Sequence, residues 1–426
     1  FLISQTAFSQ SNSEGLALKF IEYLSEEQFA KATAMFSPAV AEKLKEEQVT
    51  AIWKQINQQV GSFETVVKVD VTKKGEYEQA LALCRFQNAH LNIRLVFDQS
   101  AQVAGLFFLP AEAPTAATST APTYQLPQYA DEKKYAEEET LLNTPVGDLK
   151  AIYTYPNEVE NPPVIVFVHG SGPNDEDATL GPNKIFKDLA AGLASNGIAS
   201  YRYVKRSKAY PASFSDQMTI DDEVVDDAVK AVTAAKNLAG GPVFLLGHSL
   251  GGLMAPKIAM QASDLAGLIL LAAPNRALED LMIEQIDYII KNAEGSASSE
   301  QYLEMKKVAQ RIQSGNFDST TPKSELMNIP PSYWQDLTQY DPLKMIKRVK
   351  KPVLVLQGER DYQVTMVDFE RWKSVLKKRG TYQSYPKLNH LFFSGQGLCL
   401  PAEYGKKGFF DKTVLMDIVG WVTQNR

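Results

Sequence analysis

Val243-Phe-Leu-Leu-Gly-His-Ser-Leu-Gly-Gly252 has the pattern of a short apolar strand that turns into a helix at a serine. Gly247, Ser249 and Gly251 form G-x-S-x-G, the pattern of a nucleophile elbow. Glycines on both sides of the serine remove side chains that would collide across so sharp a turn. The helix-compatible run Leu250–Gln261 follows directly. We therefore predict that the turn presents the hydroxyl of Ser249 above a sheet as a nucleophile.

A serine nucleophile needs a base, and the chain contains only four histidines. His90 lies in an N-terminal region of different pattern, where we expect a structural or surface role. His169 closes an apolar strand, and His248 directly precedes the serine, so the turn directs it away from the hydroxyl. His390 lies between the last predicted strand and the last predicted helix, where the chain order Ser, Asp, His places the base. We predict His390 as the base.

The acid that orients the base should follow the apolar strand Pro352–Leu356. Two acids do so, Glu359 and Asp361, and we favour Asp361 because it lies farther along the loop, toward His390. Such an acid holds the imidazole in the correct tautomer and stabilises the imidazolium without taking the proton.

The oxyanion of an acyl-transfer intermediate needs two donors. We expect the backbone N–H of Leu250 and one from the loop His169-Gly-Ser-Gly172, that of Ser171. A glycine-rich phosphate loop is the alternative, but neither GK[ST] nor GxGxxG is present, so nucleotide binding is excluded.

Composition limits the classes of function. The 426 residues are 44% hydrophobic and 22% charged, with a net charge of −6 and no basic cluster, which argues against nucleic-acid partners. The longest apolar run, Leu265–Ala273, is too short to span a membrane. Cys84 and Cys399 lie far apart and form no metal-binding spacing, so we expect free thiols. Attack by a serine that a histidine activates needs neither a metal nor an organic cofactor, so we expect none.

The segment Phe1–Gln10 is apolar and then small, like the end of a secretory signal near its cleavage site. We therefore expect a periplasmic or extracellular protein.

The chain divides into two domains by pattern. Residues 1–13 form a signal remnant or disordered start, and residues 14–110 read as helices followed by antiparallel strands, a small α+β domain. Residues 111–128 are rich in Pro, Ala and Thr and form a linker. Residues 129–426 alternate strands and helices, which predicts an α/β fold with a doubly wound, mostly parallel sheet.

An insertion at about residues 276–345 separates two strands of this sheet and should form a helical lid over their carboxyl ends, where open α/β sheets bind ligands. We expect its Met and aromatic side chains to pack mainly onto the body of the domain. The predicted substrate-binding residues come from the lid and from the two loops near the serine: His169, Gly170, His248, Tyr333 and Trp334.

These motifs resemble a known family. From about Lys133 onward the chain is similar to α/β-hydrolases, and His169-Gly-Ser-Gly-Pro-Asn-Asp175 with Arg202-Tyr-Val-Lys-Arg206 resembles bacterial carboxylesterases related to dienelactone hydrolases and serine aminopeptidases. Relatives commonly have R-Y-D-K-R, so Val204 puts in doubt any pairing of that aspartate with Lys205 or Arg206. By element order, residues 14–110 resemble the nuclear-transport-factor-like domains that precede some bacterial hydrolases.

The resemblance implies hydrolysis of small-molecule acyl esters through Ser249, His390 and Asp361. A peptidase or amidase with the same triad is the alternative, and it would need an acid such as Glu279 or Glu284 to anchor a substrate amine. A non-catalytic binding protein on the same fold is a third hypothesis, which the loss of a triad residue would favour. The acyl group, the oligomeric state and the role of the N-terminal domain are not determined by the sequence.

Overall fold

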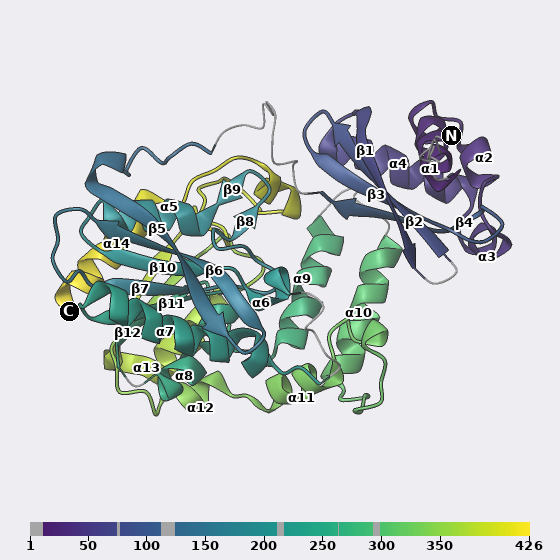
Figure 1. Cartoon of the computed structure of the whole chain (residues 1–426). Helices are drawn as coiled ribbons and strands as arrows, with labels where there is room; N and C mark the ends of the chain where they lie inside the picture. The colour runs from purple at the N-terminus through teal and green to yellow at the C-terminus, as the bar shows by residue number, and fades with distance from the viewer. Residues whose placement is uncertain (1–11, 75–76, 112–123, 211–216, 263, 293–298) are drawn as a thin grey trace. The chain divides into compact units, whose positions relative to one another are not determined.

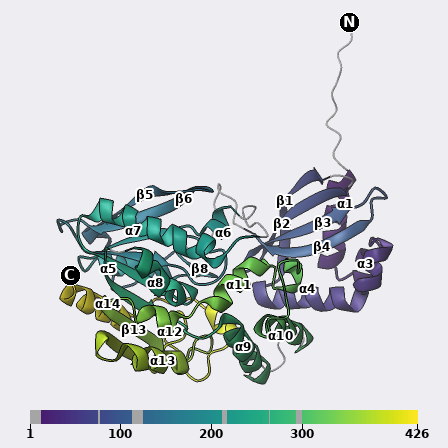
Figure 2. The same ribbon diagram turned by 90° about the horizontal axis from the view of Figure 1, so that it is seen from below.

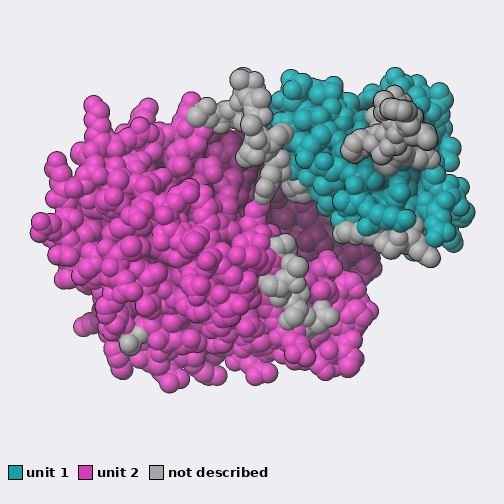
Figure 3. Space-filling model, in the orientation of Figure 1, with its two compact units in different colours: residues 1–121 teal, residues 122–426 magenta. Residues whose placement is uncertain are grey.

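The computed structural model describes residues 12–74, 77–111, 124–210, 217–262, 264–292 and 299–426. The chain forms two compact units, Phe1–Ala121 and Pro122–Arg426 (Figure 3). The boundary between them falls within the predicted linker 111–128, although residues 112–123 of that linker lie outside the described ranges. Most of the predicted signal remnant 1–13 also lies outside these ranges.

Unit 1 consists of helices followed by an antiparallel sheet in the order β1-β2-β3-β4 (Figure 1). Its elements are α1 (Asn12–Ser25), α2 (Phe29–Thr33), α3 (Pro38–Lys43), α4 (Glu46–Val60), β1 (Phe63–Lys74), β2 (Tyr77–Phe86), β3 (His90–Phe97) and β4 (Val103–Pro110). Alternate residues of β3 are buried, which gives one apolar face. The helices cover this face, and the ring of Trp53 on α4 lies 5.7 Å from that of Phe86 on β2.

Unit 2 is built on an eight-stranded sheet in the order β14-β13-β12-β11-β7-β10-β6-β5. The strands from β14 to β10 run parallel, whereas β5 and β6 form an antiparallel hairpin at one edge. The strands of this sheet are β5 (Tyr135–Thr144), β6 (Gly147–Pro156), β7 (Val164–Val168), β10 (Ala199–Tyr203), β11 (Val243–His248), β12 (Leu265–Leu271), β13 (Val353–Gly358) and β14 (Gly380–Tyr385). Two short strands, β8 (Thr179–Leu180) and β9 (Asn183–Lys184), pair separately.

Helices cover both faces of this sheet, so the predicted fold class is confirmed. The helices outside the lid are α5 (Ile185–Ala194), α6 (Arg206–Ala209), α7 (Asp226–Ala239), α8 (Leu250–Gln261), α13 (Met366–Leu376) and α14 (Lys412–Gln424). Successive residues of β7 point to opposite faces. Val166 joins the core beneath α7, α8 and α13, whereas Phe167 joins the core beneath α5 and α14.

The lid insertion lies between β12 and β13. Its helices are α9 (Leu278–Asn292), α10 (Ser299–Gln313), α11 (Pro331–Gln339) and α12 (Pro342–Ile346). Both ribbon views show α9 and α10 side by side (Figures 1 and 2). The insertion leaves the sheet at the carboxyl end of β12, the edge at which open α/β sheets bind ligands.

Cys84 and Cys399 are free, buried and located in different units. Burial raises the pKa of Cys399 to about 11 and that of Cys84 to about 12, so both thiols are protonated at neutral pH. Among the helices that the structure describes, none has the length and apolar character needed to cross a bilayer.

A buried arginine ties β10 to its neighbours. Arg202 is completely buried, and its guanidinium donates to Asp177 at 3.0 Å, to Thr154 on β6 at 2.6 Å and to Glu137 on β5 at 2.7 Å. Asp177 also accepts from Lys184 at 2.9 Å. Charged groups remain buried only when they are paired in this way.

We predict that Arg202→Met lowers the free energy of unfolding by about 3–5 kcal/mol, because it removes one of the two cations bonded to the buried carboxylate of Asp177 and the hydrogen bonds that join β10 to β5 and β6. Chemical denaturation of the full chain measures this change. Lys236→Met is the control, since Lys236 forms an ion pair with Asp264 of which both side chains are exposed. Its expected cost is below about 1 kcal/mol. Equal effects of the two substitutions would contradict the prediction.

Candidate active site

Ser249 occupies the turn between β11 and α8 in a strained backbone conformation, with φ of 53° and ψ of −120°. Such strain persists only where the surrounding structure enforces it. Here the N–H of Ser249 donates to the carbonyl of Leu271 at 3.0 Å. A Cβ at Gly247 would overlap the backbone of Gly251, and one at Gly251 would overlap the carbonyl of Val168 on β7. The glycines of the motif therefore allow α8 to start directly against the sheet.

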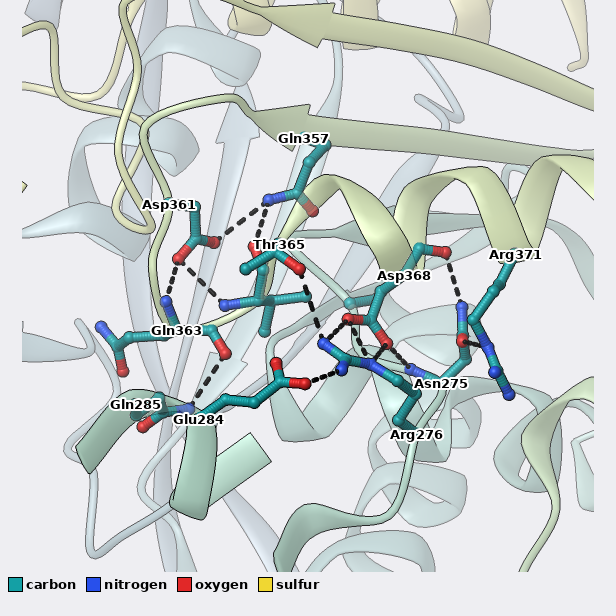
Figure 4. A network of polar contacts seen from close by, with 12 residues as sticks. Asn275, Arg276, Glu284, Gln285, Gln357, Asp361, Gln363, Thr365, Asp368 and Arg371 are labelled. Atoms are coloured by element: carbon teal, nitrogen blue, oxygen red, sulfur yellow. Dashed lines mark hydrogen bonds and ion pairs between the residues drawn. The ribbon is translucent and has the colours of Figure 1, made fainter. Parts of the chain in front are cut away.

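Asp361 and His390 form a buried hydrogen-bonded pair. His390 Nδ1 donates to Asp361 Oδ2 at 2.6 Å. Asp361 lies in the loop after β13, and its Oδ1 accepts from the N–H groups of Gln363 at 2.8 Å and Val364 at 3.1 Å. The side chain of Gln357 donates to Oδ2 at 3.2 Å (Figure 4). These donors fix the orientation of the carboxylate.

Glu359, the other acid of this loop, is exposed and accepts from Ser384 at 2.8 Å. Among the described residues, no hydrogen bond or ion pair joins it to His390. The geometry thus pairs Asp361, and not Glu359, with the imidazole.

His248 connects the turn at Ser249 with the loop after β14 that carries His390, called the histidine loop below. Its Nε2 donates to the carbonyl of His390 at 3.0 Å, and the two rings lie 4.8 Å apart between centroids. Because His248 directly precedes Ser249, these contacts bring His390 next to the turn although the two histidines are 142 residues apart. Burial, and secondarily the charge of His390, lowers the pKa of His248 to about 3. His248 is therefore neutral, and it is a structural neighbour of His390, the predicted base.

The loop after β7 approaches the serine from the other side. A Cβ on Gly170 would lie 3.2 Å from the Cβ of Ser249. The side-chain amide of Asn174 donates to the carbonyls of Gly170 at 3.3 Å, Ser171 at 3.1 Å and Gly172 at 3.0 Å. One amide thus holds three consecutive carbonyls and fixes the course of the predicted oxyanion loop.

His169 is the first residue of the same loop. It is buried, and its Nε2 donates to the carbonyl of Asp175 at 2.9 Å. Burial, followed by the charge of Lys205, lowers the pKa of His169 to about 3, so its ring is neutral. The position of His169 favours support of the loop over contact with a substrate.

Leu250 is the first residue of α8, so its N–H has no partner within the helix. Ser171 is exposed at the tip of its loop. Both positions allow these N–H groups to act as oxyanion donors, a role that stays a prediction.

Tyr333 and Trp334, the predicted substrate-binding residues of the lid, are both buried. Trp334 is completely buried, and its indole N–H donates to the carbonyl of Leu326 at 3.1 Å. Tyr333 is also buried, and its hydroxyl donates to Glu223 at 2.8 Å. Both belong to the core beneath the lid, so Trp334 presents no surface to a ligand. Apolar residues of an inserted helix cannot be assigned to core or ligand from their types alone.

The first lid helix, α9, contacts the loop after β13 that carries Asp361. Gln285 on α9 donates to the carbonyl of Gln363 at 3.0 Å, and Arg276 forms ion pairs with Glu284 and Asp368 (Figure 4). The rings of Tyr288 and Tyr362 stack with centroids 4.9 Å apart. The lid therefore packs against the loop that carries Asp361.

Sequence reasoning missed several supporting residues. Asn389 braces the histidine loop, because its side-chain oxygen accepts from the N–H groups of Leu391 at 3.0 Å and Phe393 at 3.1 Å while its amide donates to Glu403 at 2.7 Å. Glu403 in turn pairs with Arg360. The only signal for Asn389 is its position next to the histidine.

The partners of the R-Y-V-K-R segment were also missed. Lys205 forms an ion pair with Glu223 at 3.1 Å, and Arg206 forms a bidentate ion pair with Asp227. Acids from the following segment therefore supply both pairings that Val204 put in doubt. Within the described ranges, no three or more His, Cys, Asp or Glu side chains are arranged to hold a metal ion.

Comparison with known proteins adds to this geometry. A model described as an alpha/beta hydrolase family matches residues 165–396, and one described as a protein of unknown function, DUF3887, matches residues 17–106. The chain is 34% identical over 414 residues to the esterase EstD of Thermotoga maritima, covering 96% of this chain and 95% of the relative.

Two solved structures are similar at low identity. A puromycin-hydrolyzing peptidase of Mycobacterium tuberculosis has a TM-score of 0.45 and 20% identity, over 85% of this chain and 47% of its own. Est1E from Butyrivibrio proteoclasticus has a TM-score of 0.43 and 15% identity, over 67% of this chain and 98% of its own. Since the hydrolase model matches more than half of the chain and the esterase is similar along almost all of it, the chain belongs to the α/β-hydrolase family, as an esterase-type hydrolase.

Proposed function

We propose that the protein is a serine esterase that cleaves small-molecule carboxylic esters through an acyl-enzyme on Ser249. The observation that carries the proposal is the buried bond between His390 and Asp361 beside the serine turn. Nδ1 of His390 is committed to Asp361, so Nε2 is the nitrogen available to accept a proton. The similarity to an esterase supports ester cleavage.

In the proposed mechanism, Ser249 Oγ attacks the ester carbonyl while His390 Nε2 takes the hydroxyl proton. The oxyanion of the tetrahedral intermediate accepts hydrogen bonds from the N–H groups of Leu250 and Ser171. Collapse expels the alcohol, which receives the proton from Nε2. Water then attacks the acyl-enzyme with His390 again as base, and the carboxylic acid leaves as Ser249 regains its proton.

A peptidase function finds less support. Glu284 is already paired with Arg276. Glu279 is only 6% exposed, and burial raises its pKa, because the interior disfavours the charged carboxylate. One oxygen of Glu279 has no hydrogen-bond partner among the described residues, but so buried a group is poorly placed to receive a substrate amine.

We predict that Ser249→Ala lowers kcat on a p-nitrophenyl ester by about 10⁶-fold, because no other group supplies the nucleophile. A fluorophosphonate should label the native protein at Ser249 and leave the variant unlabelled. Ser374→Ala is the control, because the Ser374 hydroxyl is exposed and donates to the carbonyl of Arg371 within α13. Retention of a tenth of the native activity by Ser249→Ala would exclude the proposed nucleophile.

Asp361→Asn should reduce kcat by about 10⁴-fold, since an amide favours the wrong tautomer of His390. The matched control is Glu359→Gln in the same loop, for which we expect native kcat. Steady-state kinetics at neutral pH on one ester measures both variants. A large loss in Glu359→Gln with little loss in Asp361→Asn would reverse the assignment of the acid.

The amine anchor that a peptidase needs can be tested with a matched pair of esters. We expect the methyl ester of propionate to be hydrolysed with kcat/KM at least equal to that of the methyl ester of alanine, which differs only by the α-amine. Desolvating an unpaired ammonium costs binding energy. A clear preference for the alanine ester, together with cleavage of alanine p-nitroanilide, would favour the peptidase.

A further inference from the structure

Lys205 is a buried lysine at the back of the loop that carries Ser171. It follows β10, and its Nζ donates to the carbonyl of Gly170 at 3.0 Å and to Glu223 Oε1 at 3.1 Å. Its own N–H donates to the carbonyl of Asn174 at 3.0 Å. One residue thus holds the loop both near its start and near its end.

The bond to Gly170 has a direct geometric consequence. The carbonyl of Gly170 and the N–H of Ser171 belong to one planar trans peptide unit, so they point in opposite directions. A donor that fixes the carbonyl therefore fixes the direction of the N–H. Gly170 is also the residue of this loop that approaches the Cβ of Ser249.

Glu223 connects this lysine to the lid. It lies in the helical turn Asp221–Val225 ahead of α7, and its second carboxylate oxygen accepts from the hydroxyl of Tyr333 on α11 at 2.8 Å. All three side chains are buried, so water does not compete for these bonds. A continuous series of hydrogen bonds runs from the lid insertion to the Gly170 carbonyl.

We propose that Lys205, held by Glu223 and Tyr333, is a positioning residue that orients the Gly170–Ser171 peptide so that the Ser171 N–H meets the oxyanion. Tyr333 makes the lid insertion part of the oxyanion site. This inference rests on the proposed esterase function, because the oxyanion arises in that reaction.

A merely structural ion pair would stabilise the fold without affecting the chemical step, and a set of variants separates the two roles. Tyr333→Phe removes one hydroxyl from the series. Lys205→Met removes the donor to Gly170 but leaves Glu223 buried without its cation, which destabilises the fold. The double variant Lys205→Met/Glu223→Gln removes both charges and so restores stability, while Gly170 still lacks its donor. Tyr385→Phe is the control, because the Tyr385 hydroxyl donates to a carboxylate, that of Asp417, at 2.6 Å.

The readouts are kcat and KM on a p-nitrophenyl ester, Ki of an alkyl trifluoromethyl ketone whose serine adduct carries an oxyanion, and Tm. We expect kcat to fall about 10- to 100-fold in the double variant. Misplacing one oxyanion donor lowers kcat by at most as much as removing that donor does. Tyr333→Phe should show a smaller loss in the same direction. KM should change little, Ki should rise in parallel with the loss of kcat/KM, and Tyr385→Phe should behave as native protein.

Native kcat and Ki in both Tyr333→Phe and the double variant would overturn the proposal, as would recovery of kcat together with Tm in the double variant. Failure of the proposed function is distinct, because the native protein itself would then cleave no ester. Amide hydrogen exchange of Lys205, whose N–H donates to the carbonyl of Asn174 in this loop, tests the positioning in that case too. Exchange should accelerate in Tyr333→Phe but not in Tyr385→Phe, and unchanged protection would also overturn the proposal.

Discussion

The contact of α8 with the ends of β7 and β11 is the constraint on which the site depends. The helix starts against the backbone of both strands, which is possible only because Gly247 and Gly251 carry no side chains. This close packing holds Ser249 at a positive φ. Strand pairing on one side and helix packing on the other enforce this strain. The position of Ser249 is therefore set by three packed elements and not by bonds of its own side chain.

A parallel sheet brings its carboxyl-terminal loops to one edge, and the candidate site uses this property. The loops after β7, β11, β13 and β14 carry Ser171, Ser249, Asp361 and His390 respectively. Loops are imprecise supports unless their polar groups are satisfied. Here the loops after β7, β13 and β14 are held by hydrogen bonds from the side chains of Asn174, Gln357 and Asn389 respectively.

The lid insertion contributes to two of these loops. Its first helix contacts the loop after β13 through Gln285 and Tyr288, and its α11 is linked to the loop after β7 through Tyr333, Glu223 and Lys205. A buried charge such as that of Lys205 requires a partner, and a partner that itself bonds to the lid links the two regions mechanically. The lid residues expected to line the substrate thus support the framework around it.

Local pattern and chain order were enough for the fold class and for the turn at Ser249. A strand followed by G-x-S-x-G specifies its own geometry because glycine spacing acts over a few residues. Counting four histidines, and the position of Asp361 after its strand, led to the pair that the structure joins. Chain order was sufficient there because parallel strands deliver their loops to one edge.

Only the tertiary structure decided the contacts between distant segments. The bond from His248 to the His390 carbonyl, the acids that pair with Lys205 and Arg206, and the burial of Trp334 all depend on how the lid and the loops pack. A residue's type states what bond it can make, but not which of many chemically equal partners will lie within reach. Which partner is reached depends on how the elements are arranged in space, and the residues near a given position in the sequence do not determine that arrangement.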